Sequence, residues 1–170
     1  MDFEQICFRR YSVREFSDKP VEKTTIDKII RLARIAPSAL NNQPYEIYIA
    51  ATEEAVAKIT SADASTFGAK LVFVVCSDSD KSWSNRYSGK DSTLQDVGIV
   101  ATTIMYACEE YGLGSVYVCG FNPKKLKENL RLSDNLLPEC LIVAGYKGID
   151  SKPSPRHGIR KSVEKIFHFI

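Results

Sequence analysis

The chain has 170 residues, 44% of them hydrophobic, which is enough to bury the core of one domain. Its 23 basic and 21 acidic residues nearly cancel, which argues against a protein that wraps nucleic acid or lies on an anionic membrane. The sequence contains no apolar run as long as a signal peptide core or a membrane span. We therefore expect one cytoplasmic domain over residues 1–170, with neither nucleic acid nor membrane as a partner.

The five cysteines are odd in number and widely spaced, with neither a C-x-x-C pair nor a cysteine–histidine cluster of metal-ligand spacing. We expect them to be small buried hydrophobic side chains in a reducing compartment, and we expect no metal site. They are Cys7, Cys76, Cys108, Cys119 and Cys140.

The first half of the chain alternates between helical and extended patterns. A short helix is expected within the first nine residues, and a second begins at the capping-box pattern opened by Thr24 and stops before Pro37. Residues 45–51 and 71–76 are rich in β-branched and aromatic side chains, which predicts two strands with a short helix over 52–59 between them. We expect the second strand to be fully buried.

A polar connection and a long helix begin the second half. Residues 77–93 form a connection longer than usual, so this segment is either mobile or functional. The next helix is predicted over 93–111 and ends at the Gly-Leu-Gly of residues 112–114. We expect its buried stripe to contain Leu94, Val97, Ala101, Ile104, Met105 and Cys108.

The remaining pattern is a strand, a helix, a strand and a tail. The strand is "SVYVC", after which Asn122 and Pro123 begin a helix that runs to Leu130, and the second strand follows Pro138. The end of the chain, "IRKSVEKIFHF", is amphipathic and follows a loose linker. Such a tail is typical of a segment that docks elsewhere, in some proteins on a partner subunit.

Three arginines lie close together in "RRYSVREF". Arg10, Ser12 and Arg14 alternate, so in an extended segment they project from one side of the backbone. Like charges this close repel one another unless an anion or solvent lies between them. The cluster is therefore either a site for an anionic ligand, which the planar guanidinium groups bind bidentately, or a solvated basic rim.

Three other segments carry candidate ligand contacts, each with an ordinary structural alternative. "APSALNNQP" at 36–44 offers hydroxyl and amide side chains, but it is also a typical turn. Gly120 follows a strand, where bare backbone can approach a ligand or simply turn tightly. Arg156, Arg160 and Lys161 could neutralise a phosphate if the tail folds back toward Arg10, or they form a solvated face.

No side chain stands out as a catalytic acid, base or nucleophile. His157 and His168 lack a neighbouring acid or nucleophile in the sequence, so neither is assigned a catalytic role. The sequence also lacks G-x-S-x-G, P-loop and G-x-G-x-x-G motifs, which argues against hydrolases, P-loop NTPases and Rossmann dehydrogenases.

The order and spacing of these segments along nearly the whole chain resemble the FMN-dependent nitroreductase family. The resemblance implies an α+β, three-layer sandwich with a mainly antiparallel central sheet flanked by helices. It also implies a homodimer, with the C-terminal tail exchanged with the partner subunit and two FMN molecules at the interface. The segments that carry it are "RRYSVREF", "APSALNNQPYEIY", "DVGIVATTIMYACEEYGLGS", "VCGF", "AGY" and "RKSVEKIFHF".

The resemblance assigns roles to residues 9–16 ("RRYSVREF"), which we call the arginine segment. Arg10 resembles the arginine on the phosphate side, and Ser12 resembles a flavin contact. Arg14 resembles the cation that faces the N1 and O2 edge of the flavin. Tyr11 stands where the family usually has a second arginine, so its contact with the cofactor differs.

The other implied contacts come from three further segments. The partner subunit's wall against the flavin ring would consist of Pro37, Ser38 and Ala39, with Asn41 and Gln43 nearby. Backbone amides near N5 and O4 would come from Cys119 and Gly120, and the group that closes on the phosphate would be Arg160 and Lys161. The chain departs from the family at Tyr45, where tryptophan is usual, and in a shorter 77–93 region, and it lacks an asparagine that often contacts the flavin.

The implied activity is an oxidoreductase that takes hydride from NAD(P)H onto flavin N5. It would then pass two electrons to a nitroaromatic, quinone or similar small acceptor by a ping-pong mechanism. A flavin performs this chemistry itself, which agrees with the lack of a catalytic side chain. One alternative is a flavin-binding carrier or redox-sensing module with little turnover, and another is a small anion-binding domain without flavin.

Overall fold

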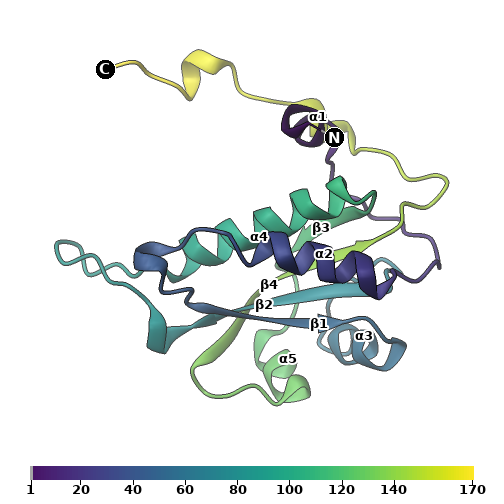
Figure 1. The fold of residues 1–170 in the computed structure, drawn as a ribbon, viewed down its shortest axis with the longest axis horizontal. Helices are drawn as coiled ribbons and strands as arrows, with labels where there is room; N and C mark the ends of the chain where they lie inside the picture. Colours follow the sequence, from purple (N-terminus) through teal and green to yellow (C-terminus); the bar gives the residue numbers. More distant parts are fainter. Residues whose placement is uncertain (1) are drawn as a thin grey trace.

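Within residues 2–170, which this computed structural model describes, four strands form one sheet at the centre (Figure 1). They lie in the order β1-β2-β4-β3, and every pairing is antiparallel, which confirms the predicted fold class. The strands are β1 (Tyr45–Ala50), β2 (Leu71–Asp78), β3 (Gly114–Val118) and β4 (Leu136–Gly145).

Helices cover both faces of this sheet and complete a three-layer sandwich (Figure 1). One face carries α2 (Lys23–Ala33) and α4 (Thr93–Glu110), and the other carries α3 (Glu53–Thr60) and α5 (Pro123–Leu130). The central strand β2 is buried at every position because its alternate side chains contact the two helical layers. The expectation of a fully buried second strand is confirmed.

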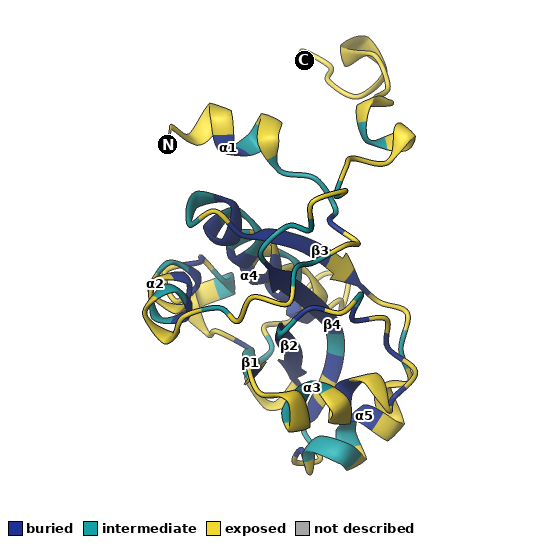
Figure 2. Cartoon of the chain, turned by 90° about the vertical axis from the view of Figure 1, so that its right-hand side faces the viewer, coloured by how far each residue is buried: buried dark blue, intermediate teal, exposed yellow. Residues whose placement is uncertain are grey.

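The start of the chain and its tail extend away from the three layers (Figure 2). α1 (Phe3–Arg9) contacts α4 through Phe3, whose ring meets Tyr106 edge-on with centroids 5.8 Å apart. The tail contains two short 3-10 turns, η3 (Pro155–Gly158) and η4 (Val163–Lys165), and every residue from 158 to 170 is exposed. Its own chain therefore leaves these apolar side chains uncovered: Ile159, Val163, Ile166, Phe167, Phe169 and Ile170.

The predicted capping box at Thr24 is wrong. α2 begins one residue earlier, at Lys23, and its N-cap residue Glu22 makes no side-chain capping bond. The Glu22 carboxylate instead accepts a hydrogen bond of 2.5 Å from the Tyr146 hydroxyl and pairs with Lys19 at 3.3 Å. These contacts hold the pKa of Glu22 down at about 2, with the Tyr146 bond as the largest cause.

The buried stripe of α4 differs from the prediction at its first turn. Leu94 is 66% exposed, whereas Thr93 and Asp96 are buried. The first turn of α4 packs against polar groups rather than against the apolar core, because the Asp96 carboxylate bonds to the backbone of Ala39.

In the described part of the chain, α4 and the other helices are too short or too polar to cross a bilayer.

β4 begins at Leu136, whereas the sequence predicts that this strand starts after Pro138. Pro138 pairs with Cys76 at a register shift between Val75 and Cys76, so Glu139 has no direct partner on β2. Proline lacks the N–H that a regular ladder needs, and a bulge accommodates it.

Burial of the cysteines is confirmed for three of the five. Cys76, Cys108 and Cys140 are buried, and burial raises the pKa of each thiol to about 12. Cys7 is half-buried, and Cys119 is exposed because it lies just beyond the end of β3.

Candidate functional site

The arginine segment lies in an extended conformation beside the edge strand β3. Ser12 bridges Ser115 in the parallel sense, and the Val13 amide donates a 3.0 Å hydrogen bond to the Ser115 carbonyl. Val13 is fully buried while Arg14 is exposed, as alternation along a strand requires. The structure therefore confirms the extended segment and places Ser12 and Arg14 on its outer side.

Two glycines allow this close approach. A Cβ atom added at Gly114 would lie 2.6 Å from Cγ2 of Val13, and one at Gly148 would lie 2.9 Å from Oε1 of Glu15. A side chain at Gly114 would displace the buried Val13 and with it the arginine segment, whereas a side chain at Gly148 would first displace the exposed Glu15 side chain. The Gly-Leu-Gly sequence that ends α4 thus also positions the predicted ligand-binding segment.

Tyr11, which precedes the bridging residue Ser12, contacts the linker that follows β4. Its hydroxyl bonds to the carbonyl and hydroxyl oxygens of Ser151 at 3.2 and 3.1 Å. Its ring meets His157 edge-on at 6.3 Å, and the Lys147 ammonium lies 4.8 Å from the ring centroid. Lys147 is fixed in turn by the buried carboxylate of Glu109 at 3.1 Å. Tyr11, a predicted cofactor contact, therefore holds residues 151–157 over the arginine segment.

A cavity of about 680 Å³ opens between the arginine segment and this linker. The Arg14 side chain bends back along its own segment, and its guanidinium donates a 3.3 Å bond to the Ser12 carbonyl. Among the described residues that line the cavity, none carries a carboxylate, so the cavity suits an anion. The lining residues are Ser12, Arg14, Lys152, Pro153, Ser154, Pro155, Arg156 and His157.

The other predicted phosphate contacts lie outside this cavity in the same chain. Arg10 caps the C-terminus of α1 through its backbone amide, which donates to Ile6. The guanidinium of Arg160 donates to the backbone carbonyls of His157 and Ile159, and Lys161 is exposed on the tail.

The sequence interpretation grouped Arg156 with Arg160 and Lys161 and left out Lys152 and His157, which also line the cavity. The signal for them is the run "KPSPRH", in which prolines alternate with basic and polar residues.

The turn of residues 38–43 is held in an unusual backbone conformation. Leu40, Asn41 and Gln43 have φ values of +51°, +58° and +49°, a region that non-glycine residues rarely adopt. Inside the turn, the Gln43 amide donates a 2.9 Å hydrogen bond to the Ser38 hydroxyl. At its base, the Ala39 amide donates a 3.0 Å hydrogen bond to Oδ1 of Asp96. These two bonds hold the turn in place, while Asn41 and Gln43 are exposed.

The turn and the arginine segment lie at opposite ends of α4. The turn contacts Asp96 in the first turn of the helix, whereas Ser12 pairs with Ser115, directly after the helix ends. The 18 residues of α4 span about 27 Å at 1.5 Å per residue. One chain therefore does not bring these two groups of predicted site residues together.

Cys119 and Gly120 form an exposed turn after β3, with a 3.1 Å backbone hydrogen bond from Phe121 to Cys119. A side chain added at Gly120 would meet no atom within 4 Å, so the backbone here is open to a ligand. Since β3 begins beside Ser12, these two residues lie one short strand away from the cavity.

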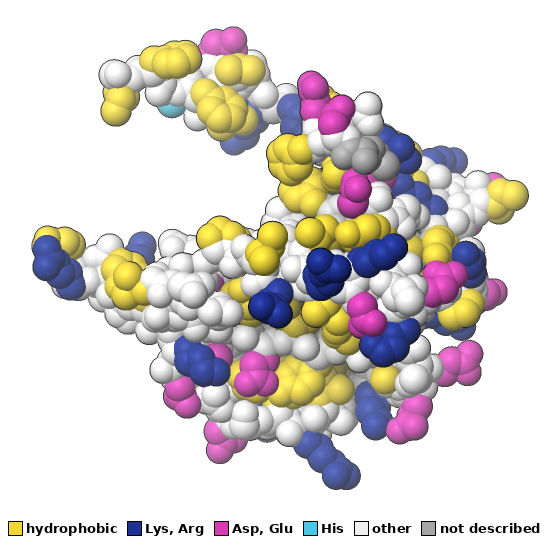
Figure 3. All heavy atoms as spheres, in the orientation of Figure 1, with side chains coloured by type: hydrophobic (Ala, Val, Ile, Leu, Met, Phe, Trp, Pro, Cys, Tyr) yellow, Lys and Arg dark blue, Asp and Glu magenta, His cyan; other side chains and the backbone are white. Residues whose placement is uncertain are grey.

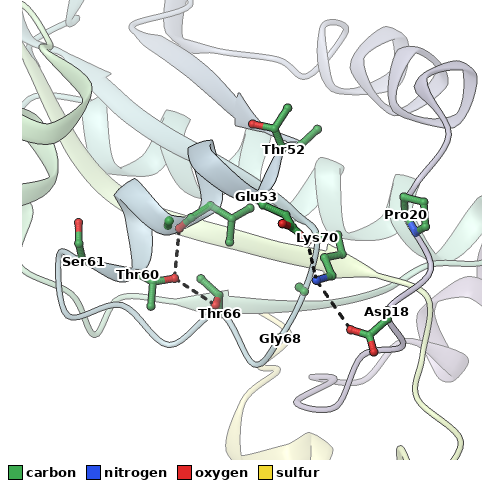
Figure 4. Close-up of a pocket in the computed structure, with 13 residues that line it drawn as sticks. Asp18, Pro20, Thr52, Glu53, Thr60, Ser61, Thr66, Gly68 and Lys70 are labelled. Atoms are coloured by element: carbon green, nitrogen blue, oxygen red, sulfur yellow. Dashed lines mark hydrogen bonds and ion pairs between the residues drawn. The ribbon is translucent and has the colours of Figure 1, made fainter.

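A second cavity, of about 800 Å³, lies between α3 and residues 66–70 and has a different character (Figure 4). Its cation, Lys70, points between the carboxylates of Asp18 at 3.8 Å and Glu53 at 3.7 Å, as Figure 4 shows. These acids already neutralise the lysine. The cavity contains none of the predicted site residues, so the cationic cavity beside the arginine segment is the better candidate for an anionic cofactor.

Comparison with known proteins identifies the family of this chain. A model of the nitroreductase family matches residues 8–67 and 59–146. A protein of Archaeoglobus fulgidus with the provisional name NADH dehydrogenase/NAD(P)H nitroreductase is 31% identical over 152 residues, covering 84% of this chain and 83% of that protein.

Two solved structures extend the likeness to three dimensions. A nitroreductase family protein from Clostridium difficile 630 is 35% identical with a TM-score of 0.91, covering 99% of this chain and 98% of that one. An FMN-dependent nitroreductase from Clostridium difficile is 25% identical with a TM-score of 0.79, covering 96% of each chain. The sequence match and the three-layer fold lead to the same conclusion: the chain belongs to the nitroreductase family.

Proposed function

We propose that this protein is an FMN-dependent oxidoreductase that takes hydride from NAD(P)H and passes two electrons to a nitroaromatic, quinone or similar small acceptor. The observation that carries this proposal is the cationic cavity formed by Arg14, Lys152 and Arg156 beside the extended segment of a nitroreductase family member. Relatives support both cofactors by name, since one is an FMN-dependent nitroreductase and another an NAD(P)H nitroreductase.

The residues present fit FMN. FMN carries an anionic phosphate and a ring edge that gains negative charge on reduction, and the cavity combines guanidinium and ammonium groups with the hydroxyls of Ser12 and Ser154. The open backbone at Gly120 suits the polar edge of a flat ring, which needs close amide donors. The chain has no glycine-rich turn for a pyrophosphate, which favours FMN over FAD.

We infer that the functional unit is a homodimer with two shared sites. Two copies are needed to put the 38–43 turn near the arginine segment, because α4 separates them within one chain. The exposed face of α4 carries an apolar groove that includes Phe3, Ile99 and Tyr106. Figure 3 shows apolar side chains gathered under the projecting tail, whose own apolar residues are also uncovered. A partner subunit would cover both surfaces.

When bound, FMN supplies the hydride and two-electron chemistry. Arg14 would place a positive charge at the ring edge and would stabilise negative charge there. The backbone of Cys119 and Gly120 would donate to polar ring atoms. The partner's Pro37, the partner's Ser38 and the partner's Ala39 would exclude water from one side, with the partner's Asn41 and the partner's Gln43 nearby. The partner's Arg160 and the partner's Lys161 would join Arg10 at the phosphate. One open slot admits donor and acceptor in turn, which gives ping-pong kinetics.

The visible spectrum of the purified protein, recorded with and without NAD(P)H, tests the proposal. We expect bound flavin absorbance, FMN on chromatography of the released cofactor, and bleaching by NAD(P)H that a nitroaromatic or quinone reverses. A colourless protein that does not bind added FMN would contradict the proposal and favour an anion-binding domain. Flavin that is reduced without steady turnover would favour a carrier or redox-sensing module.

A further inference from the structure

Asp96 is a buried carboxylate with no role in the arrangement proposed above. It is 2% exposed and lies in the first turn of α4, where the helix dipole favours a negative charge. Oδ1 accepts the Ala39 amide at 3.0 Å, and Oδ2 accepts the Ser92 hydroxyl at 2.7 Å. A buried charge is costly unless its oxygens are bonded, so these contacts are what makes the position tolerable.

The first contact fixes a strained segment that has little apolar packing of its own. Leu40 is 78% exposed, and residues 41–43 are exposed as well. Three residues of this turn have positive φ values, and each such conformation is unfavourable unless the surroundings impose it. The Ala39–Asp96 bond joins the base of the turn to the rigid helix α4.

The second contact reaches the polar connection that precedes α4. The Ser92 amide donates a 2.8 Å hydrogen bond to the Trp83 carbonyl, and the Thr93 hydroxyl donates at 2.7 Å to the Ser82 hydroxyl. The connection therefore closes on itself where it meets α4, next to Asp96. One carboxylate thus contacts both the turn and the end of this connection.

We propose that Asp96 is a positioning residue of the flavin site, which fixes the backbone of the 38–43 turn and the end of the 79–92 connection without touching the cofactor. The inference rests on the proposed function, in which the partner's turn forms a wall of the site. The role of the carboxylate is geometric, because its oxygens hold Ala39 and Ser92 in place. An amide of the same shape can therefore replace it, whereas a methyl group cannot.

The test compares Asp96→Ala with Asp96→Asn in the full-length protein. We expect Asp96→Ala to weaken FMN binding more than threefold and up to about 100-fold, the limit set by the full strength of a hydrogen bond to a charged group. Its visible circular dichroism should change as well, because the wall of the site moves. Asp96→Asn should stay within about threefold of wild type, because its amide oxygen accepts from Ala39 and its NH₂ donates to Ser92. FMN affinity is measured by quenching of flavin fluorescence, and Tm is recorded for every variant.

Leu126→Ala is the matched control for stability. Leu126 is the fully buried residue of α5, on the face of the sheet opposite α4, so this variant should lower Tm without changing FMN affinity or the dichroism. If Asp96→Ala does not fold, Ser92→Ala replaces it. That variant removes the partner of one Asp96 oxygen and should weaken FMN binding about threefold to tenfold.

Three results would overturn the inference. Asp96→Ala, or Ser92→Ala in its place, could bind FMN as wild type does, Asp96→Asn could be as impaired as Asp96→Ala, or Leu126→Ala could weaken binding equally. Failure of the proposed function is a separate result, because the wild-type protein itself would then not bind FMN.

Discussion

Val13 occupies the space that a side chain at position 114 would fill, since a Cβ atom on Gly114 would lie 2.6 Å from Cγ2 of Val13. Gly114→Ala must therefore displace the buried Val13 and with it the segment that carries Ser12 and Arg14. Overpacking of this kind costs about 1–3 kcal/mol, or roughly 2 to 12 °C in Tm for a chain of this size. We expect both Tm and FMN affinity to fall, as measured by calorimetry and flavin fluorescence.

Gly145→Ala is a graded comparison for that variant. Its added Cβ would meet a ring atom of Phe16 at 3.2 Å, a contact that a small ring movement relieves. We expect a smaller loss of Tm than in Gly114→Ala. Equal or reversed effects would show that Val13 does not determine the position of the arginine segment.

Arg14→Ala should lower the midpoint potential of bound FMN. The Arg14 guanidinium lies at the cavity, and a charge-assisted hydrogen bond to a ring edge that gains negative charge contributes about 1.5–3 kcal/mol. For a two-electron couple this corresponds to a decrease of roughly 30 to 65 mV. Arg10→Ala should weaken FMN affinity with little change in potential, because the phosphate charge does not alter on reduction. Spectroelectrochemistry that finds equal potentials for wild type and Arg14→Ala, both saturated with FMN, would refute the placement of Arg14.

Arg156→Ala should weaken FMN binding about 10- to 100-fold, because Arg156 lines the cavity together with Arg14 and a bound phosphate would lose a charged donor. Lys124→Ala removes an exposed cation from α5 and should leave the affinity unchanged. Fluorescence titration at fixed ionic strength measures both. An unchanged affinity in Arg156→Ala would show that the phosphate does not contact Arg156.

Phe167→Glu should convert the proposed dimer to a monomer that loses FMN. Phe167 is 65% exposed on the tail, and a carboxylate there cannot enter an apolar interface without a large desolvation cost. Ile149→Glu is the control, because Ile149 is fully exposed but lies in the linker before the tail. Light scattering should give twice the 19.0 kDa chain mass for wild type and the control. A wild-type monomer that retains FMN would contradict the shared site.

Asp78→Asn should destabilise the protein in a pH-dependent way. Asp78 is buried at the end of β2, and its pKa is lowered first by a hydrogen bond with Lys81, whose ammonium lies 2.7 Å away. A lowered folded-state pKa stabilises the protein above the unfolded value of about 3.9, and this stabilisation is lost as pH falls through the folded-state pKa. The Tm difference between wild type and Asp78→Asn should be largest near neutral pH and shrink below about pH 4. Asp80→Asn, an exposed neighbour, should show little difference at any pH.

Local signals in the sequence were sufficient for most element boundaries. β1 was predicted over 45–51 and spans Tyr45–Ala50, and α3 and α5 end within one residue of the prediction. The Asn122 cap is confirmed by a 3.1 Å bond from the Lys125 amide to its side chain. These signals succeed because capping, β-branching and proline act within a few residues of one another.

The errors fall where distant residues compete for the same groups. The Glu22 carboxylate bonds to the Tyr146 hydroxyl instead of capping a helix. The first turn of α4 packs against Ala39, and Leu94 is exposed. Pro138 enters β4 because β4 itself bulges at Glu139, where the register with β2 shifts. None of these partners lies near in sequence, so no local pattern could reveal the competition.

For the site, the sequence alone determined which residues are available: the alternating Arg10, Ser12 and Arg14, and the polar turn after Pro37. Only the tertiary structure decided that Arg156 lines the cavity while Arg160 lies outside it, and that the turn and the arginine segment are separated by the length of α4. The physical reason is that spacing along a chain sets the direction of neighbouring side chains, whereas packing against β3, Tyr11 and Asp96 sets where each segment lies.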